Sequence, residues 1–228
     1  PKREKKLIKY IIIHYTGMKK EELAIKRLCD PKSKVSSHYF LKKNGEIINF
    51  IPDLYTAWHA GNSCWNKINS LNRFSIGIEI SNPGHDFYYS NFSLKQIKAL
   101  ERLLKLLMKN YKISIKNVLG HSDIAPNRKK DPGEKFPWQF FSKKKLCFWH
   151  KLDLKKIKTY RKIKIKKNDE KIFLNNLYKI GYCRIKNNSL SNNKKNLVIA
   201  FQRRFRQSLI NGLIDKECLL ISKSLLNS

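Results

Sequence analysis

Two apolar runs of the sequence end in a residue type that binds metal ions, and a nearby turn supplies a third such residue. Ile11-Ile12-Ile13 leads directly into His14, and Val118-Leu119-Gly120 leads into His121. Ten residues after His121, Asp131 begins an Asp-Pro-Gly sequence. Two histidines and one carboxylate can hold a catalytic zinc ion and leave a fourth position open for water. We therefore predict one zinc ion bound by His14, His121 and Asp131.

A further apolar run, Ser75 to Ile80, contains one carboxylate, Glu79. An unpaired carboxylate between Ile78 and Ile80 is costly to bury. Near an activated water it gains a role, because it can accept the water's proton and pass it to a leaving amine. The alternative is an edge strand with Glu79 facing solvent, which strand alternation allows.

Lys129 precedes Asp131 by two residues, a spacing that could aim its ammonium group at a developing oxyanion. In a lysine-rich chain, composition alone would place it on the surface. The other candidates also have ordinary interpretations, because a histidine at a strand end is more often structural and Asp-Pro-Gly is a common turn. Only the combination indicates a zinc hydrolase.

Hydrophobic patterning predicts the elements that position these residues. Apolar runs predict strands over residues 9–14, 75–80 and 117–120, and Asn44-Gly45 between two such runs predicts a hairpin over 38–50. Helical spacing predicts helices over 20–29 and from Ser93 onward, where Gln96 completes a capping box. This order predicts an α/β fold with a mixed central β-sheet flanked by helices.

The second part of the chain has a different pattern. Residues 151–167 are rich in lysine and are predicted to be a linker between a catalytic domain, residues 1–150, and a small three-helix domain, residues 168–228. About 60 residues can fold as an independent bundle. Asp215 is the expected N-cap of the last helix.

The formal net charge of +32 favours contact with anionic surfaces. The positive residues are mostly lysines spread along the whole chain, and no nucleic-acid-binding motif accompanies them, so no specific nucleic-acid partner is predicted. The first seven residues are expected to be a loose basic arm. Because the chain begins with Pro1, we expect an upstream signal peptide or lipid anchor that could associate the protein with a membrane.

The five cysteines are widely spaced and odd in number, which predicts free thiols. The loop from Ala57 to Trp65 mixes aromatic platforms with hydrogen-bonding groups, as sites for sugars and peptides do. Its ordinary interpretation is loop packing, with His59 as a structural histidine.

Six segments, in this order, resemble the zinc-dependent N-acetylmuramoyl-L-alanine amidases, which share a fold with the peptidoglycan recognition proteins. They lie at residues 12–16, 36–39, 57–61, 72–79, 120–126 and 129–133. The resemblance implies that His14, His121 and Asp131 bind zinc, that Glu79 is the catalytic carboxylate and that Lys129 stabilises the transition state. The implied reaction is hydrolysis of the amide between N-acetylmuramic acid, ordinary or 1,6-anhydro, and L-alanine of the stem peptide. The residues expected to contact substrate are Tyr15, His38, Trp58, His59, Ala60 and Asn72.

The alternative is a non-catalytic peptidoglycan-binding protein, although the complete ligand set argues against it. Residues 200–205 and 210–215 resemble the three-helix peptidoglycan-binding domain. This pairing resembles envelope amidases of the periplasm, often outer-membrane lipoproteins, with the cytoplasm as the alternative location. We expect a monomer that binds peptidoglycan or muropeptides.

Overall fold

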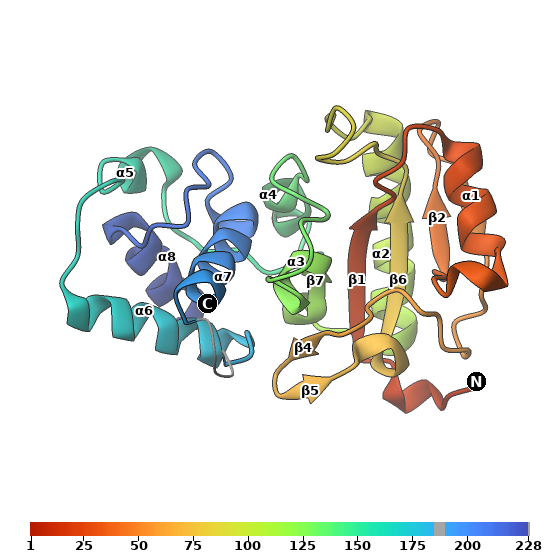
Figure 1. Cartoon of the computed structure of the whole chain (residues 1–228), viewed down its shortest axis with the longest axis horizontal. Coiled ribbons are helices and arrows are strands. Elements are labelled where there is room, and N and C mark those ends of the chain that lie inside the picture. The colour runs from red at the N-terminus through yellow and green to blue at the C-terminus, as the bar shows by residue number, and fades with distance from the viewer. Residues whose placement is uncertain (185–189, 228) are drawn as a thin grey trace.

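A five-stranded mixed β-sheet forms the centre of the larger part of the molecule (Figure 1). The computed structural model describes residues 1–184 and 190–227. The sheet has the order β3-β2-β6-β1-β7, in which only β3 is antiparallel to its neighbour. Its strands are β1 (Tyr10–Tyr15), β2 (Tyr39–Leu41), β3 (Ile47–Asn49), β6 (Ser75–Ile80) and β7 (Val118–Gly120). The predicted mixed sheet with flanking helices is confirmed.

The two faces of the sheet differ because side chains alternate along each strand. On one face, isoleucines such as Ile11 and Ile13 of β1 meet Ile76 and Ile78 of β6 in one apolar cluster. On the other face, His14 lies beside Glu79 in the parallel register. The same alternation that buries the isoleucines therefore brings a histidine and a carboxylate together at the carboxyl ends of two neighbouring strands.

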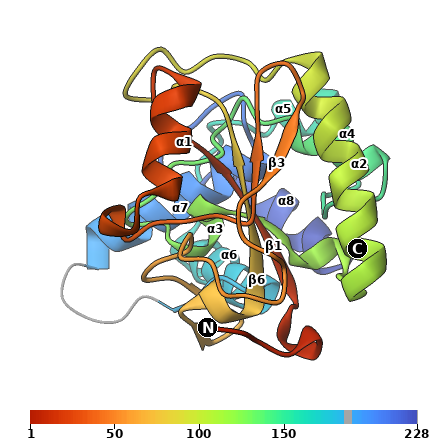
Figure 2. The ribbon, with the colours of Figure 1, turned by 90° about the vertical axis from the view of Figure 1, so that its right-hand side faces the viewer.

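Helices α1 (Glu21–Cys29) and α2 (Leu94–Tyr111) lie on opposite sides of the sheet (Figure 2). Helix α2 begins at the predicted capping box, in which Ser93 Oγ accepts from Gln96 N and the Gln96 side chain accepts from Ser93 N. Its buried stripe packs against the isoleucine face together with α4 (Trp138–Lys143). The buried leucines of this stripe are Leu100, Leu103, Leu104 and Leu107.

Shorter elements occupy the connections. The small hairpin β4 (Cys64–Trp65) and β5 (Ile68–Asn69) begins at the end of the segment predicted as a loop from Ala57 to Trp65. One turn of helix, α3 (His121–Ile124), follows β7 directly. The 3-10 helices are η1 (Lys5–Leu7), η2 (Pro31–Ser33), η3 (Leu71–Phe74) and η4 (Ile115–Asn117).

The C-terminal part is helical and packs beside β7 and α3 (Figure 1). Its helices are α5 (Leu154–Lys158), α6 (Lys167–Ile180), α7 (Leu190–Phe205) and α8 (Lys216–Leu226). Asp215 caps α8 as predicted, since its side chain accepts from Cys218 N. Helix α5 lies inside the range predicted as a linker, and one apolar cluster extends from Ile12 of β1 to Phe201 of α7. The domain boundaries stay a prediction, and residues 185–189 and 228 of the C-terminal range lie outside the described residues.

Two expectations, the loose N-terminal arm and the free state of all five cysteines, are wrong. The N-terminal arm is anchored, because the Arg3 guanidinium is buried and donates to the backbone carbonyls of Asp53, Asn72, Arg73 and Ser75. Cys64 and Cys183 form a disulfide across 119 residues of sequence, whereas Cys29, Cys147 and Cys218 are free and Cys29 is exposed. Sequence spacing gave no sign of the pairing, because β4 and the residues that follow α6 meet only in the folded chain.

No helix within the described parts of the chain has the length and apolar character needed to cross a bilayer.

The buried stripe of α2 can be tested against an exposed position on the same helix. Leu104 is 1% exposed and Leu106 is 54% exposed. Leu104→Ala is expected to lower the free energy of unfolding by about 2–5 kcal/mol, because it removes buried methyl groups and leaves a cavity. Leu106→Ala should change it by less than about 0.5 kcal/mol. Denaturant unfolding followed by circular dichroism measures both, and equal effects would contradict the assigned packing.

Candidate metal centre and active site

Three electron-pair donors converge at the carboxyl ends of the parallel strands. His14 Nδ1 lies 2.9 Å from His121 Nδ1, and each of these nitrogens lies 3.0 Å from Asp131 Oδ2. All three residues are buried, and they form a group that could hold a metal ion. The predicted trio is therefore brought together in space, although 117 residues separate its first and last members.

The backbone explains this convergence. Strand β1 is parallel to β7, with Ile13 opposite Gly120, so both strands deliver the following histidine to the same edge of the sheet. Asp131 arrives on the loop after α3, and its carbonyl accepts from Ser122 N at 2.8 Å. Ligand sites in open α/β sheets are expected at this edge, outside the carboxyl ends of the strands.

A chain of hydrogen bonds assigns the tautomer of His14. Ser75 Oγ donates to the Leu71 carbonyl at 2.7 Å, so it accepts from His59 Nε2 at 3.2 Å. His59 Nδ1 then carries a lone pair and accepts from His14 Nε2 at 3.0 Å. With its proton at Nε2, His14 presents the lone pair of Nδ1 to the centre of the trio.

His121 receives the same assignment from the backbone. Its Nε2 lies 3.2 Å from the Ala60 carbonyl, which can only accept a hydrogen bond. The His121 Nδ1 lone pair therefore also points to the centre. Histidine ligands of metals ordinarily donate their second nitrogen to a carbonyl or another acceptor, which fixes the ring.

The resulting donor set fits a zinc ion. Two imidazole lone pairs and one carboxylate oxygen repel one another unless a cation lies among them. Tetrahedral zinc with bonds of about 2.0–2.1 Å requires donor atoms about 3.3 Å apart, so this triangle needs to widen by only a few tenths of an ångström.

The charges of the trio suit metal binding. Burial, reinforced by the neighbouring His121, lowers the pKa of His14 to about 4. Burial alone would raise the pKa of Asp131, but His121 and His14 hold it well below its ordinary value. Both groups therefore keep the deprotonated form that a metal ligand requires.

Glu79 lies on β6, between β2 and β1, so the alternative of an edge strand is excluded. Its carboxylate lines the cleft beside the trio, and no hydrogen-bond donor in the described residues reaches its Oε2. Burial raises its pKa well above the ordinary value, the Asp131 carboxylate raises it further, and Lys129 opposes this. A carboxylate with a raised pKa beside a metal site is suited to take a proton from water.

An open cleft of about 450 Å³ borders the trio. Lys129 lines it, where its positive charge lowers the pKa values of both His14 and Glu79. Trp58, which is 55% exposed, and Tyr15 also line the cleft, and His59 forms part of its wall. These positions suit an aromatic platform beside a cationic group.

Three of the residues expected to contact substrate serve the architecture instead of the cleft wall. His38 is fully buried, accepts from Gly77 N at Nδ1 and donates to the Tyr55 carbonyl, so no face of its ring is open to a ligand. The Asn72 side chain accepts from His59 N and Ala60 N. Ala60 is fully buried and contributes through its carbonyl, the partner of His121.

Sequence reasoning missed several residues of the cleft. Arg27 of α1, Arg128 and Lys130 add positive charge to its lining. The lining also includes Asp86, whose Oδ1 lies 3.5 Å from Lys130 Nζ. Arg128 Nη2 also donates to the carbonyls of Ala60 and Asn62, at 2.8 and 2.9 Å. Arg128 and Lys130 are close to Asp131 in the sequence, and this closeness was a usable signal. The abundance of basic residues in the chain hid it.

Comparisons with known proteins agree with this geometry. Residues 3–134 match the family described as N-acetylmuramoyl-L-alanine amidase. The chain is 35% identical to the N-acetylmuramoyl-L-alanine amidase AmiD of Escherichia coli K12, over 96% of this chain and 82% of that protein. It is 40% identical to the 1,6-anhydro-N-acetylmuramyl-L-alanine amidase AmpD of the same organism, over 47% of this chain and 57% of that protein.

Solved structures extend the similarity to the C-terminal helices. The complex of E. coli AmiD with anhydro-N-acetylmuramic acid-L-Ala-D-gamma-Glu-L-Lys has a TM-score of 0.85 at 34% identity and covers 97% of this chain and 89% of that one. AmpDh3 from Pseudomonas aeruginosa, in complex with anhydromuramic pentapeptide, has a TM-score of 0.84 at 30% identity over 97% of this chain and 92% of that one. With the family match over more than half of its length, the chain belongs to the N-acetylmuramoyl-L-alanine amidase family.

Proposed function

We propose that this N-acetylmuramoyl-L-alanine amidase cleaves its substrate with one zinc ion held by His14, His121 and Asp131. The hydrolysed bond is the amide between N-acetylmuramic acid and L-alanine of the stem peptide. The observation that carries the metal proposal is the triangle formed by His14 Nδ1, His121 Nδ1 and Asp131 Oδ2. The second nitrogen of each histidine is held by a hydrogen-bond acceptor. The complete ligand set makes a binding-only protein the weaker alternative.

When bound, a zinc ion supplies Lewis-acid polarisation of the scissile carbonyl and activation of water. Glu79 accepts the proton of the attacking water and returns it to the departing amine of L-alanine. Lys129 directs its ammonium group toward the negative charge that develops on the carbonyl oxygen. Tyr15, Trp58 and His59 form the wall against which the substrate is oriented.

The cleft suits an anionic muropeptide. Trp58 offers an exposed aromatic face to a sugar, and Arg27, Arg128 and Lys130 offer charges to the carboxylates of a stem peptide. The complexes of AmiD and AmpDh3 contain anhydromuramic peptides. We propose muropeptides or peptidoglycan as substrate, with muramic acid in the ordinary or the 1,6-anhydro form, and the helical C-terminal part as a peptidoglycan-binding unit in a monomeric protein.

We place the protein in the cell envelope, in the periplasm or anchored to the outer membrane, with the cytoplasm as the alternative. Support comes from the Cys64–Cys183 disulfide, because disulfides persist in oxidising compartments. The high positive charge would assist binding to anionic envelope polymers without a specific nucleic-acid partner.

Metal removal tests the zinc proposal. Chelation is expected to abolish release of free peptide from a purified muropeptide, and stoichiometric zinc should restore it. His121→Ala should fail to recover, because it loses one of three ligands. Mass spectrometry of products from ordinary and 1,6-anhydro substrates measures both the activity and the preference. Full activity after complete metal removal would contradict the proposal.

Glu79→Gln tests the role of the carboxylate. It preserves shape and hydrogen-bonding capacity but cannot accept a proton, so kcat should fall about a hundredfold to ten-thousandfold while zinc content is unchanged. Glu46→Gln, at an exposed turn of the β2–β3 hairpin, is the matched control and should behave as wild type. Wild-type turnover by Glu79→Gln would assign the base elsewhere.

The disulfide can be tested independently of activity. Peptide mapping without reduction is expected to find Cys64 linked to Cys183, and alkylation should modify Cys29 of the native protein. Replacing both linked cysteines with serine should lower the free energy of unfolding by about 2–4 kcal/mol, because the closed loop is long. Chemical denaturation measures this, and a Cys29→Ser control should show almost no loss. Unlinked thiols at 64 and 183 in protein from an oxidising compartment would contradict the pairing.

A further inference from the structure

Helix α7 contacts the turn that carries His121. Arg204 is 3% exposed, and its guanidinium donates to Asp123 Oδ2 at 2.5 Å and to the Val118 carbonyl at 3.0 Å. Val118 begins β7 and Asp123 lies within α3, so His121 sits between the two points that Arg204 grips. One side chain from the C-terminal part thus holds both sides of the strand-to-helix turn.

Both carboxylate oxygens of Asp123 accept hydrogen bonds at this point. Its Oδ2 also accepts from Gly120 N at 2.8 Å, and its Oδ1 accepts from Tyr182 Oη at 2.8 Å. Asp123 is buried, and Arg204 is its salt-bridge partner. Loss of Arg204 would leave a buried carboxylate with two hydrogen bonds but without its cationic partner, which is costly and favours rearrangement of the turn.

The same C-terminal segment also contacts the loop that carries Asp131. Gln207 Nε2 donates to the carbonyls of Glu134 and Phe136, at 2.6 and 2.7 Å. The backbone bond from Ser122 N to the Asp131 carbonyl connects this loop to α3. Two of the three metal-binding residues therefore lie on segments that are held from the C-terminal part.

We propose that Arg204 and Gln207 are positioning residues for the metal site and that zinc affinity depends on the docking of the C-terminal helices. The inference rests on the proposed site at His14, His121 and Asp131. The C-terminal part would then position metal ligands of the catalytic centre, in addition to any contact that it makes with peptidoglycan. Neither side chain touches the metal ligands directly; each acts through the backbone segment that presents a ligand.

Arg204→Met in the full chain tests the proposal through zinc binding, without reference to activity. Competition with a chromophoric chelator should show zinc affinity lower by about tenfold to a hundredfold, the usual size of effects from groups that orient metal ligands. Gln207→Leu removes only two hydrogen bonds from a half-buried side chain, and we expect a loss of severalfold. Because Gln207→Leu should fold normally, it keeps the proposal testable if Arg204→Met does not.

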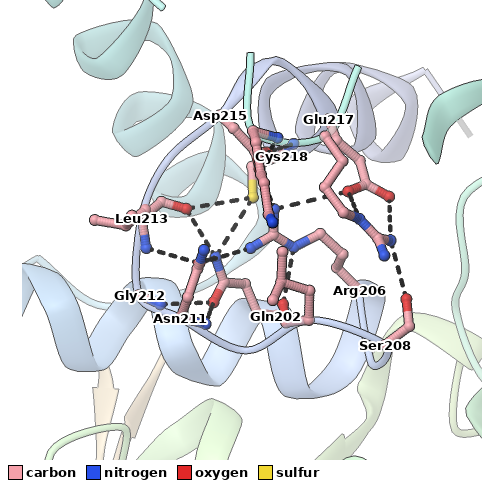
Figure 3. Close-up of polar contacts among 12 residues, drawn as sticks. Gln202, Arg206, Ser208, Asn211, Gly212, Leu213, Asp215, Glu217 and Cys218 are labelled. Carbon is pink, nitrogen blue, oxygen red and sulfur yellow. Dashed lines mark hydrogen bonds and ion pairs between the residues drawn. The ribbon is translucent and has the colours of Figure 1, made fainter. Parts of the chain in front are cut away.

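Arg206 provides the matched control (Figure 3). It is also 3% exposed and paired with a buried carboxylate, Asp215. Its other partners are Glu217, Asn211 and the Leu209 carbonyl, which all lie within the C-terminal part. Arg206→Met should lower the unfolding temperature about as much as Arg204→Met does. Its zinc affinity should stay within about twofold of wild type.

The possible outcomes separate the two proposals. Absence of zinc binding by the wild-type protein, or unchanged binding by His121→Ala, would overturn the proposed metal site itself. Wild-type zinc affinity in both Arg204→Met and Gln207→Leu, with His121→Ala defective, would overturn the positioning role alone. Equal losses in Arg204→Met and Arg206→Met would trace the effect to general destabilisation and also overturn it. Loss in Arg204→Met and Gln207→Leu with retention in Arg206→Met supports it.

Discussion

Three lone pairs held about 3 Å apart in a buried site repel one another unless a cation lies among them, and the surrounding structure supplies the forces that hold them there. Each strand ladder brings one histidine to the edge of the sheet. The His59–Ser75 chain and the Ala60 carbonyl orient the two rings. The site therefore depends on hydrogen bonds to residues that are not themselves metal ligands.

The two faces of the sheet have different roles. The isoleucine face packs on α2 and contributes apolar burial, whereas the opposite face carries the charged and polar groups beneath the cleft. Gly77 shows how closely the polar layer is packed, because a Cβ there would lie 2.4 Å from the His59 ring. A residue with no side chain on β6 thus makes room for the histidine that orients His14.

Much of the fold could be predicted because it rests on local signals. The apolar run Ser75–Ile80 and the Ser93–Gln96 capping box could be recognised from the neighbouring sequence alone. Contacts between distant segments could not be predicted in this way. Arg3 lies in the segment expected to be a loose arm, but its guanidinium is buried and donates five hydrogen bonds to four backbone carbonyls. The Cys64–Cys183 pair forms only because two distant segments meet.

The sequence by itself indicated the chemistry at the edge of the sheet, because it showed which residues could bind a metal. It also showed that Glu79 interrupts an apolar strand, where an unpaired carboxylate is costly to bury. Parallel strands present their final residues at one edge, so residue type and order sufficed. Only the tertiary structure decided that His38 is enclosed, that His59 relays a hydrogen bond to His14, and that Arg204 grips the turn before and after His121. The physical reason is that tautomer, burial and ion pairing depend on which atoms surround a side chain, and residues far apart in sequence supply those atoms.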